Sequence, residues 1–183
     1  MEDVVDFDNV APEDRAELRK GLIDQLAYLV QEVAALKTVV DAVPEDVQAG
    51  RPTSEDLTMK EIYGLIATLD GEVRGPVVEA LADGTSPPSV PADPPRRQVR
   101  RDAWNARDIQ SVLDAVQDAR RRFVEALNAV PPDDWTQTIV VGGEPITLFE
   151  WTHRIAETDL ERLRDLGYRL HDADLSDRST NDA

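Results

Sequence analysis

Leucine and valine side chains recur at alternating steps of four and three residues through the first long segment of the chain. This spacing puts them on one face of an α-helix. Pro12 suits the first turn of such a helix, and Pro44 ends it, because the residue before a proline is disfavoured in helical conformation. We therefore predict a helix from about Pro12 to Ala42 and a polar loop from Pro44 to Asp56. The apolar face contains Leu22, Leu26, Leu29, Val33, Leu36, Val40 and Val43.

A second helix is predicted after this loop. Thr58 stands three residues before Glu61, the spacing of a capping box. Pro76 is expected to kink or interrupt the helix, and Asp83-Gly84 to end it. The apolar face contains Ile62, Leu65, Leu69 and Val73. The next segment, residues 86–95, has five prolines in ten residues and is too rich in proline for a helix or a central strand.

Two further helices follow the proline-rich segment. Asn105 is a plausible cap for a third helix that ends before Pro131 and Pro132. Residues 135–146 are extended in character, and Gly142-Gly143 predicts a turn, so at most a small hairpin forms there. Thr147 and Glu150 repeat the capping-box spacing and open a fourth helix. The face of the third helix contains Ile109, Val112, Val116, Phe123, Leu127 and Val130.

These elements predict an all-α fold: a four-helix bundle of the up-down-down-up type. A long proline-rich crossover connects helices two and three, and any hairpin is confined to the segment before helix four. We predict an acidic N-terminal segment at 1–11, the bundle at 12–170 and an acidic, disordered tail at 171–183, where few apolar residues occur.

Charge and composition narrow the class of protein. The net charge of −17 repels phosphate groups, so nucleic acid and anionic membranes are not expected partners. The lack of cysteine excludes disulfides, cysteine-bound zinc and a cysteine nucleophile. Without an apolar run long enough to span a bilayer, or a signal-peptide pattern at the start, we expect a cytoplasmic protein. A homodimer is the default oligomer for such a fold.

Aspartate outnumbers glutamate, and only three of the basic residues are lysines. This composition suggests adaptation to concentrated salt, where the Debye length falls to about 3 Å and self-repulsion is screened. The alternative is an ordinary acidic protein. The many neighbouring acids, including Glu157 and Asp159, are expected on a solvated surface and receive no catalytic role.

The predicted core face of helix four contains two successive polar positions, Thr158 and Arg162. The face runs through Leu148, Trp151, Ile155, Thr158, Arg162 and Leu166. Burial of an arginine costs free energy unless it is paired. One interpretation is a polar pocket inside the bundle. The other is that Arg162 extends to water or to a surface acid.

The order and spacing of several motifs resemble the DinB-like superfamily. The run 58–66, TMKEIYGLI, looks like the family's first helix motif, and 147–150 with 158–163 looks like its last. Residues 102–107 and 132–135 are also similar, so the resemblance covers roughly residues 15–170. It implies a four-helix bundle that holds a divalent metal through three histidines and acts with a low-molecular-weight thiol, mycothiol or bacillithiol, as a transferase or isomerase.

At the three positions where the resemblance places metal-binding histidines, this chain has Leu65, Thr158 and Arg162. Leucine cannot bind a metal, threonine is a poor neutral ligand, and arginine stays protonated. Its charge would be repelled from a divalent cation by roughly 8 kcal/mol at about 4 Å and an effective dielectric of about 20. His153 falls away from the core face, where only a surface site is conceivable. We therefore predict that no metal or cofactor is bound.

The candidate site is a pocket near the vacated metal position, with Trp151 and Tyr63 as aromatic wall residues. Arg162 is expected to pair with Glu61 or with an anionic small molecule. One hypothesis is a non-enzymatic or small-ligand-binding protein. The alternative is a thiol-dependent transferase or isomerase with a diverged active site, in which Arg162 stabilises an anion. The pocket residues are Arg162, Thr158, Glu61, Leu65, Tyr63 and Trp151.

Overall fold

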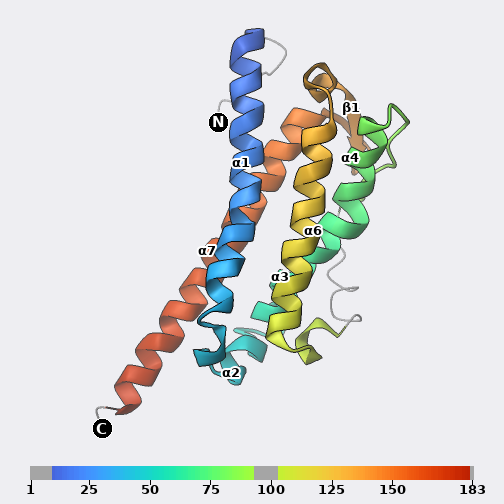
Figure 1. Ribbon diagram of the computed structural model, residues 1–183. Coiled ribbons are helices and arrows are strands. Elements are labelled where there is room, and N and C mark those ends of the chain that lie inside the picture. Colours follow the sequence, from blue (N-terminus) through green and yellow to red (C-terminus); the bar gives the residue numbers. More distant parts are fainter. Residues whose placement is uncertain (1–9, 93–102, 182–183) are drawn as a thin grey trace.

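The structure, a computed structural model, describes residues 10–92 and 103–181 (Figure 1). The described chain is mostly helical, as the sequence predicts, with one small two-stranded sheet. Its main helices are α1 (Pro12–Lys37), α2 (Glu45–Ala49), α3 (Met59–Thr68), α4 (Gly75–Ala82), α6 (Ile109–Ala129) and α7 (Leu148–Asn181). The strands are β1 (Thr138–Val141) and β2 (Glu144–Thr147). Single 3-10 turns occupy Val40–Ala42, Trp104–Ala106 and Pro132–Thr136.

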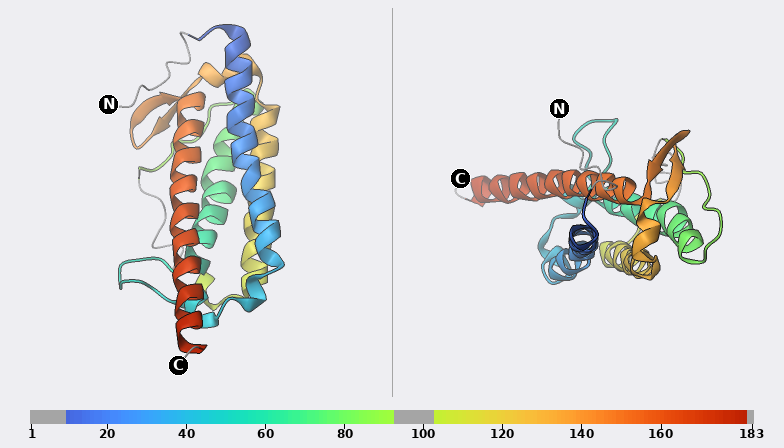
Figure 2. Two further views of the ribbon diagram at one scale, coloured as in Figure 1. Left: turned by 90° about the vertical axis from the view of Figure 1, so that its left-hand side faces the viewer. Right: turned by 90° about the horizontal axis from the view of Figure 1, so that it is seen from above.

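The long helices lie side by side. In Figures 1 and 2, α1 and α7 run in one direction, while α6 and the continuous rod of α3 and α4 run in the opposite direction. Helix α1 packs on α6, α6 packs on α3 and α4, and α7 contacts α1 and α3. Because the α3–α4 rod and α6 are parallel, the chain must travel the length of the molecule between them. Part of that connection, including the end of the proline-rich segment, lies outside the described residues.

Local sequence signals explain most helix boundaries. Thr58 and Glu61 form the predicted capping box at the start of α3. The cap of α6 is Asp108, whose side chain accepts a hydrogen bond from the Gln110 backbone, and not the predicted Asn105, which lies in a 3-10 turn. Helix α1 ends at Lys37 and leaves a separate 3-10 turn before Pro44.

The predicted interruption near Pro76 takes the form of a π-helical segment, Leu69–Arg74. It lies between α3 and α4, and Pro76 falls in the first turn of α4. A π segment adds a residue to the turn and redirects the side chains around it. Asp70 and Arg74, which lie in this segment, are both buried.

The predicted hairpin is present. β1 and β2 pair antiparallel, with Thr138 opposite Thr147 and Val141 opposite Glu144. Gly142 and Gly143 form the turn with φ of 60° and 87°, a geometry that glycine adopts without strain. Val90, from the first part of the proline-rich connection, exchanges backbone hydrogen bonds of 2.8 Å with Val140 and Gly142.

The apolar interior forms two clusters, which we call the hairpin-end cluster and the loop-end cluster. The hairpin-end cluster includes Leu22, Leu26, Val77, Val78, Leu81, Phe123, Leu127, Trp135, Ile139, Leu148, Trp151, Ile155 and Ala156. The loop-end cluster includes Leu29, Val33, Met59, Ile62, Tyr63, Leu65, Ile66, Leu69, Trp104, Val112, Val116, Ala119 and Leu166. On three of the helical rods, buried charged side chains lie between the two clusters. They are Asp70 and Arg74 on the α3–α4 rod, Arg120 on α6 and Asp159 on α7, and we call them the charged layer.

Two predicted boundaries differ from the structure or fall outside it. Helix α7 continues to Asn181, through the segment predicted to be a disordered tail. Most of the predicted acidic N-terminal segment lies outside the described residues. Within the described ranges, no helix combines the length and apolarity needed to cross a membrane.

Candidate functional site

The charged layer joins four side chains from three helical rods. Asp159 on α7 accepts two hydrogen bonds from Arg74, at 2.9 and 3.1 Å, in a bidentate pair. Arg120 on α6 donates to Asp159 and, through Nε, to Asp70 at 2.6 Å. Arg74 also donates to Asp70 at 2.7 Å. Every carboxylate in the layer therefore contacts at least two guanidinium groups, the geometry in which a buried ion pair is best compensated.

Burial makes these contacts strong. The Asp70 and Arg120 side chains are 0% and 1% exposed, and the four formal charges of the layer cancel. Burial alone would raise the pKa of Asp159, but the charges of Arg74, Arg120 and Arg162 outweigh it and hold that pKa well below its ordinary value. Burial likewise opposes the charge on Arg74, yet Asp159 and Asp70 raise its pKa. Asp159 and Arg74 therefore stay ionised at neutral pH.

Arg162 extends the layer towards the surface. Its side chain is 18% exposed, and Nη1 donates to Asp159 at 2.7 Å. Arg162 is therefore mostly buried and can contribute to a pocket. The predicted acid partner was Glu61, whereas Asp159 is the acid that forms this ion pair.

Glu61 has another role at the start of α3. It is 2% exposed, closes the capping box with Thr58 and pairs with both terminal nitrogens of Arg51. The hydrogen bond from Arg51 to Glu61 is the main cause of a raised pKa of Arg51. Glu61 thus anchors the loop that precedes α3.

The prediction that Thr158 faces the core is wrong. Thr158 is exposed, and its hydroxyl donates to the carbonyl of Arg154 at 2.8 Å. The next residue, Asp159, takes the buried position and is 3% exposed, so its assignment to the solvated surface is also wrong. Both steps, Ile155 to Thr158 and Ala156 to Asp159, fit a helical face, and apolar spacing alone does not choose between them.

Arg120, Asp70 and Arg74 were not among the site residues predicted from the sequence. A signal for Arg120 was available, because it stands four residues after Val116 and three before Phe123, on the apolar face of its own helix. Asp70 and Arg74 are spaced as a helical ion pair. Both are buried within the π segment, which the sequence pattern does not reveal.

Leu65, Thr158 and Arg162, the three positions carried over from the resemblance, line one cavity of about 280 Å³ between α3 and α7. We call it the α3–α7 cavity. Arg169 also lines it and bridges α7 to the start of α3, donating to the Leu57 carbonyl at 2.6 Å. The Arg169 Nε atom is buried and has no hydrogen-bond partner in the described chain. Asp56, Glu161 and Asp165 are the acidic residues of the lining.

Two other predicted pocket residues lie elsewhere. Tyr63 belongs to the loop-end cluster, where burial and the charge of Glu32 raise its pKa. Trp151 belongs to the hairpin-end cluster. Neither is among the residues that line the α3–α7 cavity.

These residues do not fit a divalent metal. Leu65 offers no donor atom, and Arg162 places a cation, already paired with Asp159, at the third position. In the described part of the chain, no three His, Cys, Asp or Glu side chains are grouped to hold a metal ion. His153 is exposed, 3.4 Å from Glu157 on the outer face of α7.

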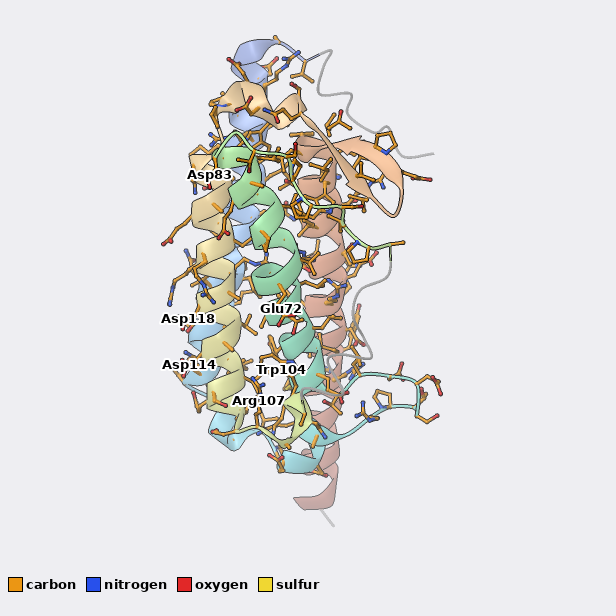
Figure 3. All side chains as sticks on the ribbon, turned by 90° about the vertical axis from the view of Figure 1, so that its right-hand side faces the viewer. Glu72, Asp83, Trp104, Arg107, Asp114 and Asp118 are labelled. Atoms are coloured by element: carbon orange, nitrogen blue, oxygen red, sulfur yellow. The ribbon has the colours of Figure 1, made fainter. Side chains whose placement is uncertain are left out.

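A packing contact shapes the loop-end cluster near this cavity. Trp104 is buried against α3 with Arg107 stacked 3.8 Å from its ring centre (Figure 3). A Cβ atom added at Gly64 would lie 2.3 Å from the Trp104 ring. Glycine at this position is therefore what lets the indole ring reach α3, next in sequence to Leu65.

Comparisons with protein-family models, with curated proteins and with solved structures gave no match for this chain.

Proposed function

We propose that this chain is a DinB-like four-helix bundle that binds a small anionic molecule and does not use the divalent metal of that superfamily. The parallel arrangement of the α3–α4 rod and α6, flanked by α1 and α7 in the opposite direction, supports the up-down-down-up topology. The motifs at residues 58–66 and 158–163 support the resemblance.

The observation that carries the proposal is the donor set of the α3–α7 cavity. Arg162 and Arg169 both line it, and Arg169 Nε is a buried donor that lacks an acceptor in the described chain. A buried donor without a partner costs free energy that a bound acceptor recovers. Guanidinium groups bind carboxylates and phosphates through paired hydrogen bonds.

The cavity also contains acidic side chains, so the anion must be small and directed at the arginines. Asp165 forms an ion pair with Arg169 at 2.7 Å, and Asp159 holds Arg162 from the interior. These acids fix the two guanidinium groups in place. A compact ligand with one or two carboxylate or phosphate groups suits such a site.

Calorimetric titration with succinate and with inorganic phosphate, with neutral succinamide as the matched control, tests the proposal. We expect binding of at least one anion and none of succinamide. In Arg162→Gln and Arg169→Gln, affinity should fall about tenfold, the value of one charged hydrogen bond. Arg121→Gln, which removes an exposed arginine from α6, should leave the affinity unchanged.

Metal content of untagged protein, measured by mass spectrometry and by melting scans with zinc and nickel, tests the second half of the proposal. We expect substoichiometric metal and no thermal shift. Near-stoichiometric metal, or anion binding that Arg121→Gln weakens as much as Arg169→Gln, would overturn the proposal. Turnover with low-molecular-weight thiols that is lost in Arg162→Gln would favour the alternative, a thiol-dependent transferase or isomerase.

A further inference from the structure

A second cavity, of about 350 Å³, lies between α1 and α7 at the level of the charged layer. We call it the α1–α7 cavity. Most of its wall is apolar and comes from both clusters, with Leu26 and Ala156 on one side of the layer and Leu29 and Leu163 on the other. Its volume is within the range of about 300–1,000 Å³ typical of small-molecule sites.

Glu32 is the unusual member of this lining. Its side chain is half-buried on α1, and its Oε2 atom is buried with no hydrogen-bond partner in the described chain. It forms no ion pair with any described residue. Burial raises the pKa of Glu32, as expected for a carboxylate removed from water without a compensating cation.

The two arginine side chains near Glu32 are either paired with other acids or exposed to solvent. Arg120 lines the same cavity, but its guanidinium is bound to Asp70 and Asp159. Arg164 also lines it and is exposed to solvent. Glu32 therefore combines a negative charge, partial burial and an unused acceptor, and a ligand that donates a charged hydrogen bond would satisfy all three.

We propose that the α1–α7 cavity binds a small organic ammonium ion, with the charged head on Glu32 and the apolar body against the leucine wall. Tyr28 and Leu160, two large side chains that are 57% and 48% exposed, also line this cavity and would cover the alkyl part of such a ligand. The net charge of −17 raises the local concentration of cations around the protein. This site is separate from the α3–α7 cavity and takes a ligand of opposite charge.

Calorimetric titration of the full chain with hexylammonium, at physiological ionic strength, tests this site. Hexanol and hexanoate are the neutral and anionic controls of the same length. We expect hexylammonium to bind most tightly. Glu32→Gln should weaken hexylammonium binding about tenfold, the value of one charge-assisted hydrogen bond, and should bring its affinity close to that of hexanol.

Two further variants keep the result interpretable. Glu157→Gln removes an exposed acid from α7 and changes the net charge by the same amount as Glu32→Gln, so it should leave binding unchanged. Leu160→Ala, at an exposed position where folding is not at risk, should weaken binding by about fourfold or less, in line with the loss of buried methylene surface.

Absence of hexylammonium binding would overturn the proposal. Equal binding of hexanol and hexylammonium would overturn it too, because it indicates an apolar site that does not recognise a charged head group. An equal loss of affinity in Glu32→Gln and Glu157→Gln would also overturn it, because it indicates attraction to the net charge alone. None of these outcomes bears on the anion site, since Arg162 and Arg169 do not line this cavity.

Discussion

The two apolar clusters on either side of the charged layer are built differently. At the hairpin end, one stretch of chain from Val130 to Leu148 folds over the helix ends and places Trp135, Ile139 and Leu148 in full burial. Arg19 from α1 donates hydrogen bonds to the carbonyls of Asn128 and Val130 at the end of α6, and lies 5.3 Å from the Trp135 ring centre. One continuous segment and one helix therefore cover this end.

At the loop end, several short segments from different parts of the chain cover the helix ends. Short turns before α3 and before α6 meet there, and the α3–α7 cavity opens among Leu57, Ile62 and Leu65. The α1–α7 cavity crosses the charged layer between the two ends. The two ends therefore differ in how they are covered: the α3–α7 cavity lies at the loop end, and the α1–α7 cavity lies at the charged layer and borders both clusters.

The largest effect is expected at the layer that separates the two ends. Asp159→Ala leaves Arg74 and Arg120 with a single carboxylate, Asp70, so the free energy of unfolding should fall by about 3–5 kcal/mol. Urea unfolding followed by circular dichroism measures it. Asp118→Ala, on the exposed face of α6 (Figure 3), is the control and should change little. Equal small losses in both variants would mean that the layer adds nothing to stability.

The next effect compares the two ends directly. Leu127 at the hairpin end is fully buried, so Leu127→Ala should cost about 2–5 kcal/mol through transfer and cavity terms. Leu65 at the loop end already borders the α3–α7 cavity, so Leu65→Ala enlarges an existing space and its cost should lie at the lower end of that range. The same urea series measures both. A larger loss for Leu65→Ala would reverse our interpretation of which end is closed.

A smaller effect concerns the contact that closes part of the loop end. Gly64→Ala would push a methyl group into the Trp104 ring and should destabilise the protein by about 1–3 kcal/mol, although alanine favours helix. Gly71→Ala meets no atom within 4 Å and serves as the matched substitution. Thermal melting compares the two. If Gly64→Ala were as stable as Gly71→Ala, the Trp104 contact would not be tight.

The weakest expected effect is a dependence on pH below the ordinary range of aspartate. The lowered pKa of Asp159 means that its stabilisation is present above about pH 4, the pKa of an unfolded aspartate. It is lost as the pH falls towards the folded value. In Asp159→Asn, the free energy of unfolding should therefore fall less steeply as the pH is lowered, by at most about 1.4 kcal/mol per pH unit. Asp118→Asn should keep the wild-type slope, and identical slopes for all three proteins would rule out the assigned role.

The sequence predicts most of the helices because their signals are local. The capping box of Thr58 and Glu61, the paired glycines at 142 and 143 and the prolines at 76 and 131 each act within one turn of the chain. The hairpin and the interruption of the second helix were predicted for this reason. The end of α1 at Lys37 lies well before Pro44, the residue predicted to stop that helix. The extension of α7 beyond residue 170 was not, because its composition gives no apolar face.

The candidate site was predicted only in part. Leu65, Thr158 and Arg162 line one cavity, but Asp159 and not Thr158 lies on the buried face. Choosing between those neighbouring positions requires the partners of Asp159 on other helices, Arg74 and Arg120. Such a contact joins residues far apart in the chain, and no spacing rule within one helix reveals it.

The charged layer also determines how the helices can slide past one another. A shift of α7 by one turn, about 5.4 Å along its axis, would move Asp159 away from Arg74 and Arg120 and leave charges unpaired between two apolar clusters. Leucine and valine faces tolerate such a shift, because one apolar layer resembles the next. The four buried charges do not, so they select a single axial alignment of the rods.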